Sequence, residues 1–489
     1  MTDNGAARHP AITADRHSRF WKGGPIAMGG APWGVVRLGP TAAHLLRRAI
    51  TTYPAPVTLH GELERQAAHR LIERGLAHPV HPRPAPPGQA PRSGADPTPA
   101  PPLDVEIVVP VYGRPELLDR CLAGLRGQRV IVVDDASPTH HVSEIAARHG
   151  ARLVRHPTNR GPAAARNTGL RATTAPVVAF IDADCLAPTG WTQTLARHFH
   201  DPRVVAVAPR IRPLPGRAFL IVRYEHARSA LDMGPDPALV RPGSHLGFLP
   251  SAALLVRRDA LHERGFDEDL RLGEDVDLVW RLADAGGHVR YDPTVIVEHE
   301  LRDRPRAWAK RRFEYGTSAA DLATRHPQRL TPLRISPWNL AALAALATGR
   351  PRTAALTTGL ATLALARSLR TSGVDPTLAP VVVGKGLVAD AAAIGHALRR
   401  EWWPLGWTLL ARAPSSTAAR AAALTVLTPL ALEWCRARPP LDPLRYTAMR
   451  LLDDALYGSG VLTSAARAHR ADPVLPRLRR RALWRPGRG

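Results

Sequence analysis

The chain has 489 residues, 45% of them hydrophobic, so it is long enough for about three domains and too apolar to be wholly disordered. Its net charge of +24, from 66 Lys or Arg and 42 Asp or Glu, favours anionic partners such as nucleotides, phosphates or acidic lipids. Three scattered cysteines, no signal-peptide core and no zinc-finger spacing argue against a disulfide scaffold, secretion and nucleic-acid binding. We therefore expect a cytoplasmic protein.

The first 80 residues predict a small module behind a short tail. Residues 1–30 are expected to be the tail. In 31–81, "GPTAAHLLRRAI" predicts a helix that starts at Pro40, and "GELERQAAHRLIERGL" predicts a second helix with Leu63 on its apolar face. Extended segments flank both helices, which favours a winged-helix-like module over a helical hairpin without a role in recognition. Residues 82–102 contain nine prolines and predict a linker.

Residues 103–328 alternate strand and helix patterns. Runs at 105–111 and 129–135, with "ARLVRHP" (151–157) and "PVVAFID" (176–182), read as strands, and amphipathic segments separate them. This order predicts an α/β domain with a parallel sheet, in which ligands bind beyond the carboxyl ends of the strands. Polar residues at those ends are therefore the candidates for function.

The first two strand ends predict a nucleotide site. The first strand ends in "VPVYGRP", which places Pro110 and Tyr112 at the crevice, and the second ends at Asp134 and Asp135. A carboxylate there can accept hydrogen bonds from a ribose or a uracil N–H. The third strand leads into "HPTNRGPAAARNTG", where Arg166 is suited to an anion.

The fourth strand ends in "FIDADC". Asp182 and Asp184, separated by the small Ala183, match the oxygen preference of Mg²⁺ or Mn²⁺, which would hold the diphosphate of a nucleotide. The alternative is that the two aspartates only open a turn and cap the next helix.

A second acidic cluster lies about 90 residues later, in "GEDVDLVWRLADAG". Glu274 and Asp275 fall in the first turn of a predicted helix, where the helix dipole favours carboxylates for structural reasons alone. The functional alternative is a general base, which the dipole would keep ionised and weak. His299 ends the next extended run and is a candidate metal ligand, or a purely structural histidine.

Residues 103 to about 320 resemble the family 2 (GT-A fold) nucleotide-sugar glycosyltransferases through "VVPVYGR", "VVDDAS", "NRGPAAARNTG", "FIDAD" and "GEDVDLVWRL" in that order. The resemblance implies inverting transfer from a nucleotide diphosphate sugar, with a divalent cation as cofactor. Asp135 would contact the nucleoside, Asp182 and Asp184 the ribose and the metal, and Asp275 would be the base. The "QxxRW" of processive synthases is absent, and "KRRFEYG" (310–316) stands in that neighbourhood.

The leading stretch "GGAPWGVVRLGPTAAHLLRRA" resembles mycofactocin-system glycosyltransferases, whose small first domain is similar to peptide-recognition modules. This implies transfer of glucose, from UDP-glucose, to a redox cofactor made from a short peptide. A rhamnosyl- or galactosyltransferase of cell-envelope saccharide synthesis and a non-catalytic peptide carrier remain alternatives.

The C-terminal region, 329–489, is expected to be α-helical. Its apolar runs are only about a dozen residues long, Pro429 interrupts one of them, and "VGKGLV" around Lys385 reads as a surface turn. Buried helices are one interpretation. The other is a peripheral seat on the inner face of the cell membrane, with Trp402, Trp403 and Trp407 beside Arg399 and Arg400.

Overall fold

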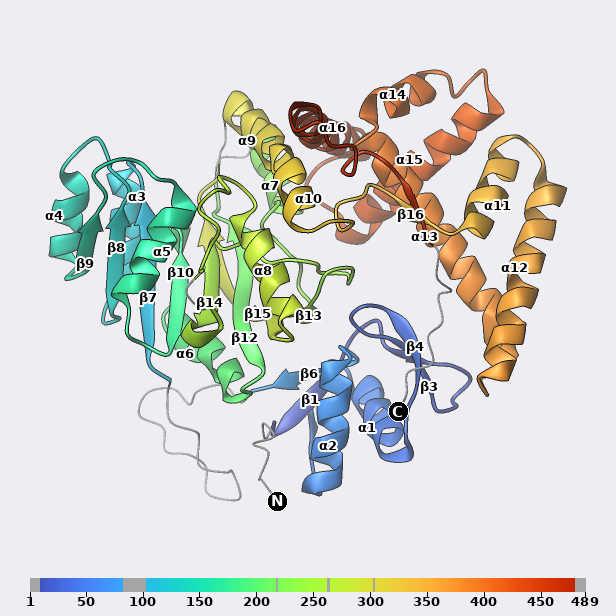
Figure 1. Cartoon of the computed structure of the whole chain (residues 1–489), viewed down its shortest axis with the longest axis horizontal. Helices are drawn as coiled ribbons and strands as arrows, with labels where there is room; N and C mark the ends of the chain where they lie inside the picture. The colour runs from blue at the N-terminus through green and yellow to red at the C-terminus, as the bar shows by residue number, and fades with distance from the viewer. Residues whose placement is uncertain (1–8, 82–102, 217–218, 262–263, 302–303, 480–489) are drawn as a thin grey trace. The chain divides into compact units, whose positions relative to one another are not determined.

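The computed structural model describes residues 9–81, 103–216, 219–261, 264–301 and 304–479. The chain divides into two compact units, Met1–Pro215 with Ser229–Leu301, and Gly216–Arg228 with Arg302–Gly489 (Figure 1). The predicted linker, 82–102, lies outside the described residues. The second unit begins earlier than the expected boundary at residue 328, because the helix that follows Arg302 packs with the C-terminal helices.

The N-terminal module contains both predicted helices, α1 (Pro40–Thr52) and α2 (Gly61–Glu73). Leu45, Leu46 and Leu71 are buried in its core, but Leu63, expected on the same face, is 73% exposed. Two small sheets complete the module. The first contains β1 (Ala11–Ala14), β5 (Val57–Thr58) and β6 (Ala77–Val80), and the second contains β2 (Arg19–Phe20), β3 (Ile26–Gly29) and β4 (Gly34–Arg37).

The expected tail is therefore structured from Ala11 onward. β1 pairs antiparallel with β5 and β6, and Ile12 is fully buried in the module core. The four-residue strand was too short to give a periodic signal, and it is set by pairing with residues about 65 positions away.

The first unit also contains a nine-stranded sheet in the order β11-β15-β12-β14-β10-β7-β8-β9, with β13 beside β15. Its strands are β7 (Val105–Val111), β8 (Val130–Asp134), β9 (Arg152–Arg155), β10 (Val177–Ile181), β11 (Cys185–Leu186), β12 (Val204–Pro213), β13 (Ala238–Val240), β14 (Ala253–Arg257) and β15 (His288–His299). Its helices are α3 (Pro115–Gly124), α4 (His141–Arg148), α5 (Pro162–Ala172), α6 (Trp191–Ala196), η1 (Arg197–His200), η2 (Arg258–Leu261) and α8 (Glu274–Asp284).

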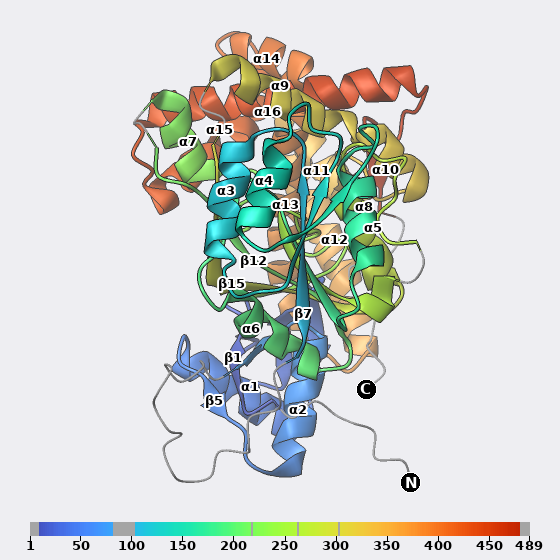
Figure 2. The same cartoon turned by 90° about the vertical axis from the view of Figure 1, so that its left-hand side faces the viewer.

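The four strands predicted from the sequence, β7 to β10, are parallel to one another, as expected. The sheet as a whole is mixed, because β14 runs antiparallel between β10 and β12. Helix α3 lies on one face and α5 on the other (Figure 2). Gly169 of α5 lets that helix approach β7, since a Cβ there would lie 2.2 Å from Val108 Cγ1.

The second unit is helical, as predicted. Its elements are α7 (Leu220–Arg228), α9 (Pro305–Thr317), α10 (Ala319–Arg325), β16 (Arg334–Ile335), α11 (Pro337–Ala347), α12 (Pro351–Thr371), η3 (Pro376–Leu378), α13 (Ala379–Arg399), α14 (Trp403–Ala411), α15 (Thr417–Ala437), α16 (Pro443–Arg467) and β17 (Arg477–Leu478). Pro429 lies inside α15 and does not end it.

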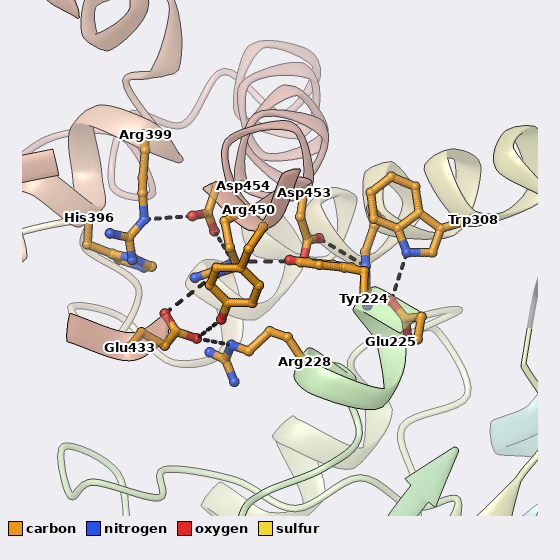
Figure 3. A network of polar contacts seen from close by, with 12 residues as sticks. Tyr224, Glu225, Arg228, Trp308, His396, Arg399, Glu433, Arg450, Asp453 and Asp454 are labelled. Carbon is orange, nitrogen blue, oxygen red and sulfur yellow. Dashed lines mark hydrogen bonds and ion pairs between the residues drawn. The ribbon is translucent and has the colours of Figure 1, made fainter. Parts of the chain in front are cut away.

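A buried polar network holds the helices of this unit together (Figure 3). Tyr224 Oη of α7 donates to Asp453 of α16 at 2.6 Å, and Arg399 Nε of α13 donates to Asp454 at 2.6 Å. Arg312, in the "KRRFEYG" segment of α9, pairs with Glu225 and Asp453. This arginine is buried among carboxylates and not directed at a phosphate.

Lys385 lies in the middle of α13, so the expected surface turn is wrong. Within the described residues, one helical run, Pro376–Arg399, is long and apolar enough to cross a membrane, with a mean hydropathy of 1.5. It carries the buried Asp390, whose carboxylate accepts a hydrogen bond from Asn339 of α11 at 2.8 Å. A buried carboxylate with a protein partner is typical of a core helix as well as of a functional membrane site.

Candidate active site

The polar residues predicted at the strand ends meet at one edge of the sheet. Tyr112 follows β7, Asp134 ends β8 with Asp135 directly after it, and Asp182 follows β10. Tyr112 is 59% exposed, whereas Pro110 and Ala183 are half-buried. The parallel register of β7, β8 and β10 produces this arrangement, because strands that run in one direction end at one edge.

Asp135 fixes the loop in front of α5. Its carboxylate accepts hydrogen bonds from His156 Nδ1 at 2.7 Å, from the backbone N–H of Arg160 at 2.8 Å and from that of Gly161 at 2.7 Å. The side chain is buried, so most of its acceptor capacity is used inside the protein. The expected contact with a nucleoside is left to the remaining lone pair and stays a prediction.

Asp134 is fully buried and lies 2.9 Å from Arg155 Nη1. It also accepts from the backbone N–H of Ser137 at 2.8 Å. Sequence reasoning did not single out Arg155 or His156. The signal for them was their position in "VRHP" at the end of the third strand, where polar side chains face the same edge as the aspartates.

Arg166 joins the two acidic clusters. It is 3% exposed, and it donates from Nη2 to Asp182 Oδ1 at 2.7 Å and from Nη1 to Glu274 Oε1 at 2.8 Å. Burial opposes its charge, but these carboxylates and Asp275 outweigh burial and raise the pKa of Arg166. The arginine predicted to meet a ligand anion therefore pairs with the protein's own carboxylates.

Glu274 and Asp275 open α8 after Gly273, whose φ of 83° is in the left-handed region. Asp275 accepts hydrogen bonds from the backbone N–H of Ser251 at 3.2 Å and of Val276 at 2.8 Å. Glu274 is directed at Arg166. The two neighbours thus have different surroundings, and which of them acts as a base stays a prediction.

The helix dipole does not keep Asp275 a weak base, and this expectation is wrong. Burial raises the pKa of Asp275, with a further contribution from Asp182, against Arg166 and the two backbone donors. Burial and the charge of Asp275 also raise the pKa of Glu274 to about 7, against Arg166. The effects of desolvation and of neighbouring carboxylates on these pKa values exceed the effect of the helix dipole, because three acidic groups share one arginine.

The remaining candidates lie on β11 and the end of β15. Cys185 of β11 is opposite His299 of β15, and His299 Nε2 lies 3.5 Å from Asp184 Oδ1. Across the described ranges, no group of three or more His, Cys, Asp or Glu side chains is arranged to hold a metal ion. Asp182 points to Arg166, so two of the three predicted ligands come together. A carboxylate and an imidazole do fit a divalent cation whose other ligands are phosphate oxygens.

The raised pKa values predict a pH dependence for any reaction that uses Asp275 as a base. We expect kcat/KM to increase with pH and to level off above about pH 7, when the acidic pair is ionised. Stability changes in the opposite direction: the folded pKa of Glu274 exceeds its ordinary 4.5, so the protonated carboxyl stabilises the fold below 4.5 and this contribution is lost as the pH rises to about 7.

A matched variant tests the coupling between the two carboxyls. Glu274→Gln removes one negative charge, so the positive charge of Arg166 acts more strongly on Asp275 and lowers its pKa. The inflection of kcat/KM is therefore expected at lower pH than in the wild type. The measurement is kcat/KM in buffers of constant ionic strength from about pH 5 to about pH 9. A flat profile, or an inflection that moves upward in Glu274→Gln, contradicts the assignment.

Comparison with known proteins identifies the family. Residues 106–265 match the family described as "Glycosyl transferase family 2". The pre-mycofactocin glycosyltransferase of Mycobacterium tuberculosis is 36% identical over 482 residues, which is 96% of this chain and 98% of the relative. The glycosyltransferase AglE of Haloferax volcanii is 26% identical over 212 residues, 40% of this chain and 67% of the relative.

Among solved structures, the mannosyltransferase PcManGT from Pyrobaculum calidifontis, in complex with GDP-Man and Mn²⁺, is 23% identical with a TM-score of 0.37, and the match covers 70% of this chain and 91% of that one. The identity of 36% over nearly all of both chains decides the assignment. The chain belongs to the family 2 glycosyltransferases of GT-A fold, among the pre-mycofactocin glycosyltransferases.

Proposed function

We propose that this glycosyltransferase moves glucose from UDP-glucose, with inversion, to the peptide-derived precursor of a redox cofactor. The acceptor class rests on the pre-mycofactocin glycosyltransferase that matches this chain over 96% of its length. The chemistry rests on one observation above all, a continuous charge cluster beside Asp184 and His299. Arg166 and Glu274 are buried in it, and Asp182 and Asp275 are partly exposed.

In this proposal Asp275 is the general base. It takes the proton of the acceptor hydroxyl as that oxygen forms a bond to the anomeric carbon, while the bond from this carbon to the diphosphate breaks on the opposite side. The raised pKa of Asp275 makes it a better proton acceptor than an ordinary aspartate. The backbone N–H groups of Ser251 and Val276 hold its carboxylate in place.

Arg166 is a positioning residue. Through its two guanidinium nitrogens it fixes Asp182 on the donor side and Glu274 next to the base. Asp184 and His299 would hold a divalent cation, Mg²⁺ or Mn²⁺, which neutralises negative charge on a bound diphosphate. The exposed ring of Tyr112, with Pro110, Ala183 and the aspartates of β8, forms the nucleotide side of the site.

The proposal is tested by incubating the protein with its acceptor, obtained as the unglycosylated precursor, and with UDP-glucose, UDP-galactose or dTDP-rhamnose in the presence of Mn²⁺. Mass spectrometry is expected to show the addition of hexose only with UDP-glucose, and the anomeric proton signal of the product to show a β linkage. Asp275→Asn protein is the matched control for uncatalysed transfer.

Each of the other outcomes supports a different function or mechanism. Transfer of rhamnose or galactose to a lipid-linked saccharide, with none to the peptide-derived acceptor, would establish the cell-envelope alternative. An α linkage would exclude inversion. Binding of the acceptor without transfer or hydrolysis of any sugar nucleotide would revive the non-catalytic carrier.

A further inference from the structure

Three helices of the second unit, α11, α12 and α15, expose several large apolar side chains. In α12 the buried residues include Ala354 and Ala361, while Leu356, Leu360 and Leu363 are 65, 47 and 57% exposed. A soluble helix buries its leucines and exposes its small and polar residues. These three leucines therefore face away from the bundle that the alanines contact, whereas Leu369, near the end of α12, is buried.

The exposed leucines of α12 form one stripe. Leu356, Leu360 and Leu363 are spaced i, i+4, i+7, which places them on one face of a helix. Arg352 lies four residues before the first and Arg367 four residues after the last, so the same face carries an exposed guanidinium at each end. We name this set, Arg352, Leu356, Leu360, Leu363 and Arg367, the α12 stripe.

Helix α15 repeats the arrangement. It buries Ala419, Val426 and Leu430, and it exposes Leu424, Leu427 and Leu432 at 66, 41 and 49%. Exposed Arg420 and Arg438 stand near its two ends. Helix α11 contacts both α12 and α15, and it exposes Trp338, Leu340 and Leu346 while Ala342 and Ala345 are buried.

We propose that the exposed faces of α11, α12 and α15 bind the surface of a membrane that contains anionic lipid. The apolar stripes would enter the boundary between headgroups and acyl chains, and the arginines at their ends would extend to lipid phosphates with their methylene groups against the apolar layer. This interaction surface is independent of the reaction proposed above.

Charge favours lipid over a second copy of the chain. From residue 337 to residue 438 the sequence has eleven Arg or Lys and four Asp or Glu, of which Arg399 and Asp390 are buried. Two such surfaces facing each other would bring like charges together, whereas anionic lipid supplies the opposite charge. Trp338, 48% exposed at the start of α11, is a residue type typical of the membrane interface.

The proposed membrane-binding surface differs from the one expected from the sequence, which lay around Arg399, Arg400 and the tryptophans that follow them. Arg399 is buried against Asp454, and Arg400 lies 3.5 Å from the ring centroid of Tyr457. Trp402 Nε1 donates to the backbone oxygen of Val474 at 2.7 Å. Of the residues named there, Trp407 remains 41% exposed. Because Arg399 is buried and Arg400 is engaged by Tyr457, the candidate surface moves from that segment to the three helices.

The first test is cosedimentation of the full chain with vesicles of phosphatidylcholine alone or mixed with phosphatidylglycerol. We expect binding to the anionic vesicles to exceed binding to the neutral ones by roughly tenfold or more and to weaken in high salt. The triple variant Leu356→Gln, Leu360→Gln, Leu363→Gln should lose roughly tenfold in partitioning. The control is Leu63→Gln with Leu444→Gln, two leucines 73 and 82% exposed on α2 and α16.

A label gives a second readout. Of the three cysteines, Cys121 and Cys185 are buried and Cys435 is exposed, on α15 between Leu432 and Arg438. An environment-sensitive fluorophore on Cys435 should shift to shorter wavelength with anionic vesicles and remain unchanged with neutral ones. Sugar-nucleotide turnover by the α12 variant in the absence of vesicles shows that it is folded.

Three results would overturn the proposal. They are no sedimentation with either kind of vesicle, undiminished binding by the α12 triple variant, and a dimer in sedimentation velocity that the same variant dissociates. The last result would assign the surface to a second copy of the chain. Unchanged fluorescence of Cys435 with bound vesicles would remove α15 from the surface.

Discussion

Asp275→Asn is expected to lower kcat by roughly 10² to 10⁴-fold, the usual contribution of a general base, while the affinity for the sugar nucleotide stays close to that of the wild type. The amide keeps the size of the side chain and can still accept the backbone N–H bond from Ser251 or Val276, but it cannot take a proton. The loss therefore falls on the chemical step. Calorimetric titration with the sugar nucleotide, followed by turnover assays, separates binding from catalysis.

Glu274→Gln is the matched control, because it changes the adjacent carboxyl by the same atoms. Glu274 pairs with Arg166 and is not held by the donors that hold Asp275, so its replacement should reduce kcat less. If Asp275→Asn turns over normally while Glu274→Gln is inactive, the roles of the two neighbours are reversed. If both remain active, the base lies elsewhere in the chain.

The residues at the strand ends were predictable because their signal is local. A buried apolar run that ends in aspartate marks both the strand and its functional end, and β8 and β10 each end as their runs predict. The helix starts at Pro40 and Glu274 were equally clear, since proline, glycine and acidic residues mark first turns. The same reasoning placed Leu63 in the core, but its side chain is exposed. The other apolar positions of α2 form the buried face of the helix without it.

The features that the sequence did not predict depend on contacts between residues that are distant in sequence. Nothing near Arg166 shows that it will meet Glu274, 108 residues later. The raised pKa of Asp275 follows from its burial in the folded chain and from Asp182, against the lowering effect of Arg166. Likewise β14 runs antiparallel because the chain returns through the sheet after β12, a path that no window of sequence contains. The sequence left open whether the apolar runs of α12 form a core or a surface, because apolar content alone does not tell which face of a helix is covered.

Asp184→Ala is expected to lower kcat by roughly 10² to 10³-fold, equivalent to ~3–4 kcal/mol, and to weaken sugar-nucleotide binding. Asp184 lies beside His299, and with either of them removed a diphosphate would face too few positive charges. The variant should fold, because the Asp184 side chain is partly exposed at the crevice. The measurement is the initial rate as a function of Mn²⁺ concentration, in which Asp184→Ala and His299→Gln should both require more metal.

Asp182→Ala should behave differently, and this separates metal binding from charge positioning. Asp182 holds Arg166, so its loss should change the pH at which the Glu274 and Asp275 pair ionises and leave the Mn²⁺ requirement nearer to that of the wild type. Asp104→Ala, an exposed carboxylate just before β7 and so at the opposite end of that strand, is the control for a lost surface charge. Full activity of Asp184→Ala, or of the wild type in excess EDTA, would remove the cation from the reaction, whereas a shifted Mn²⁺ requirement in Asp182→Ala would return that aspartate to the metal site.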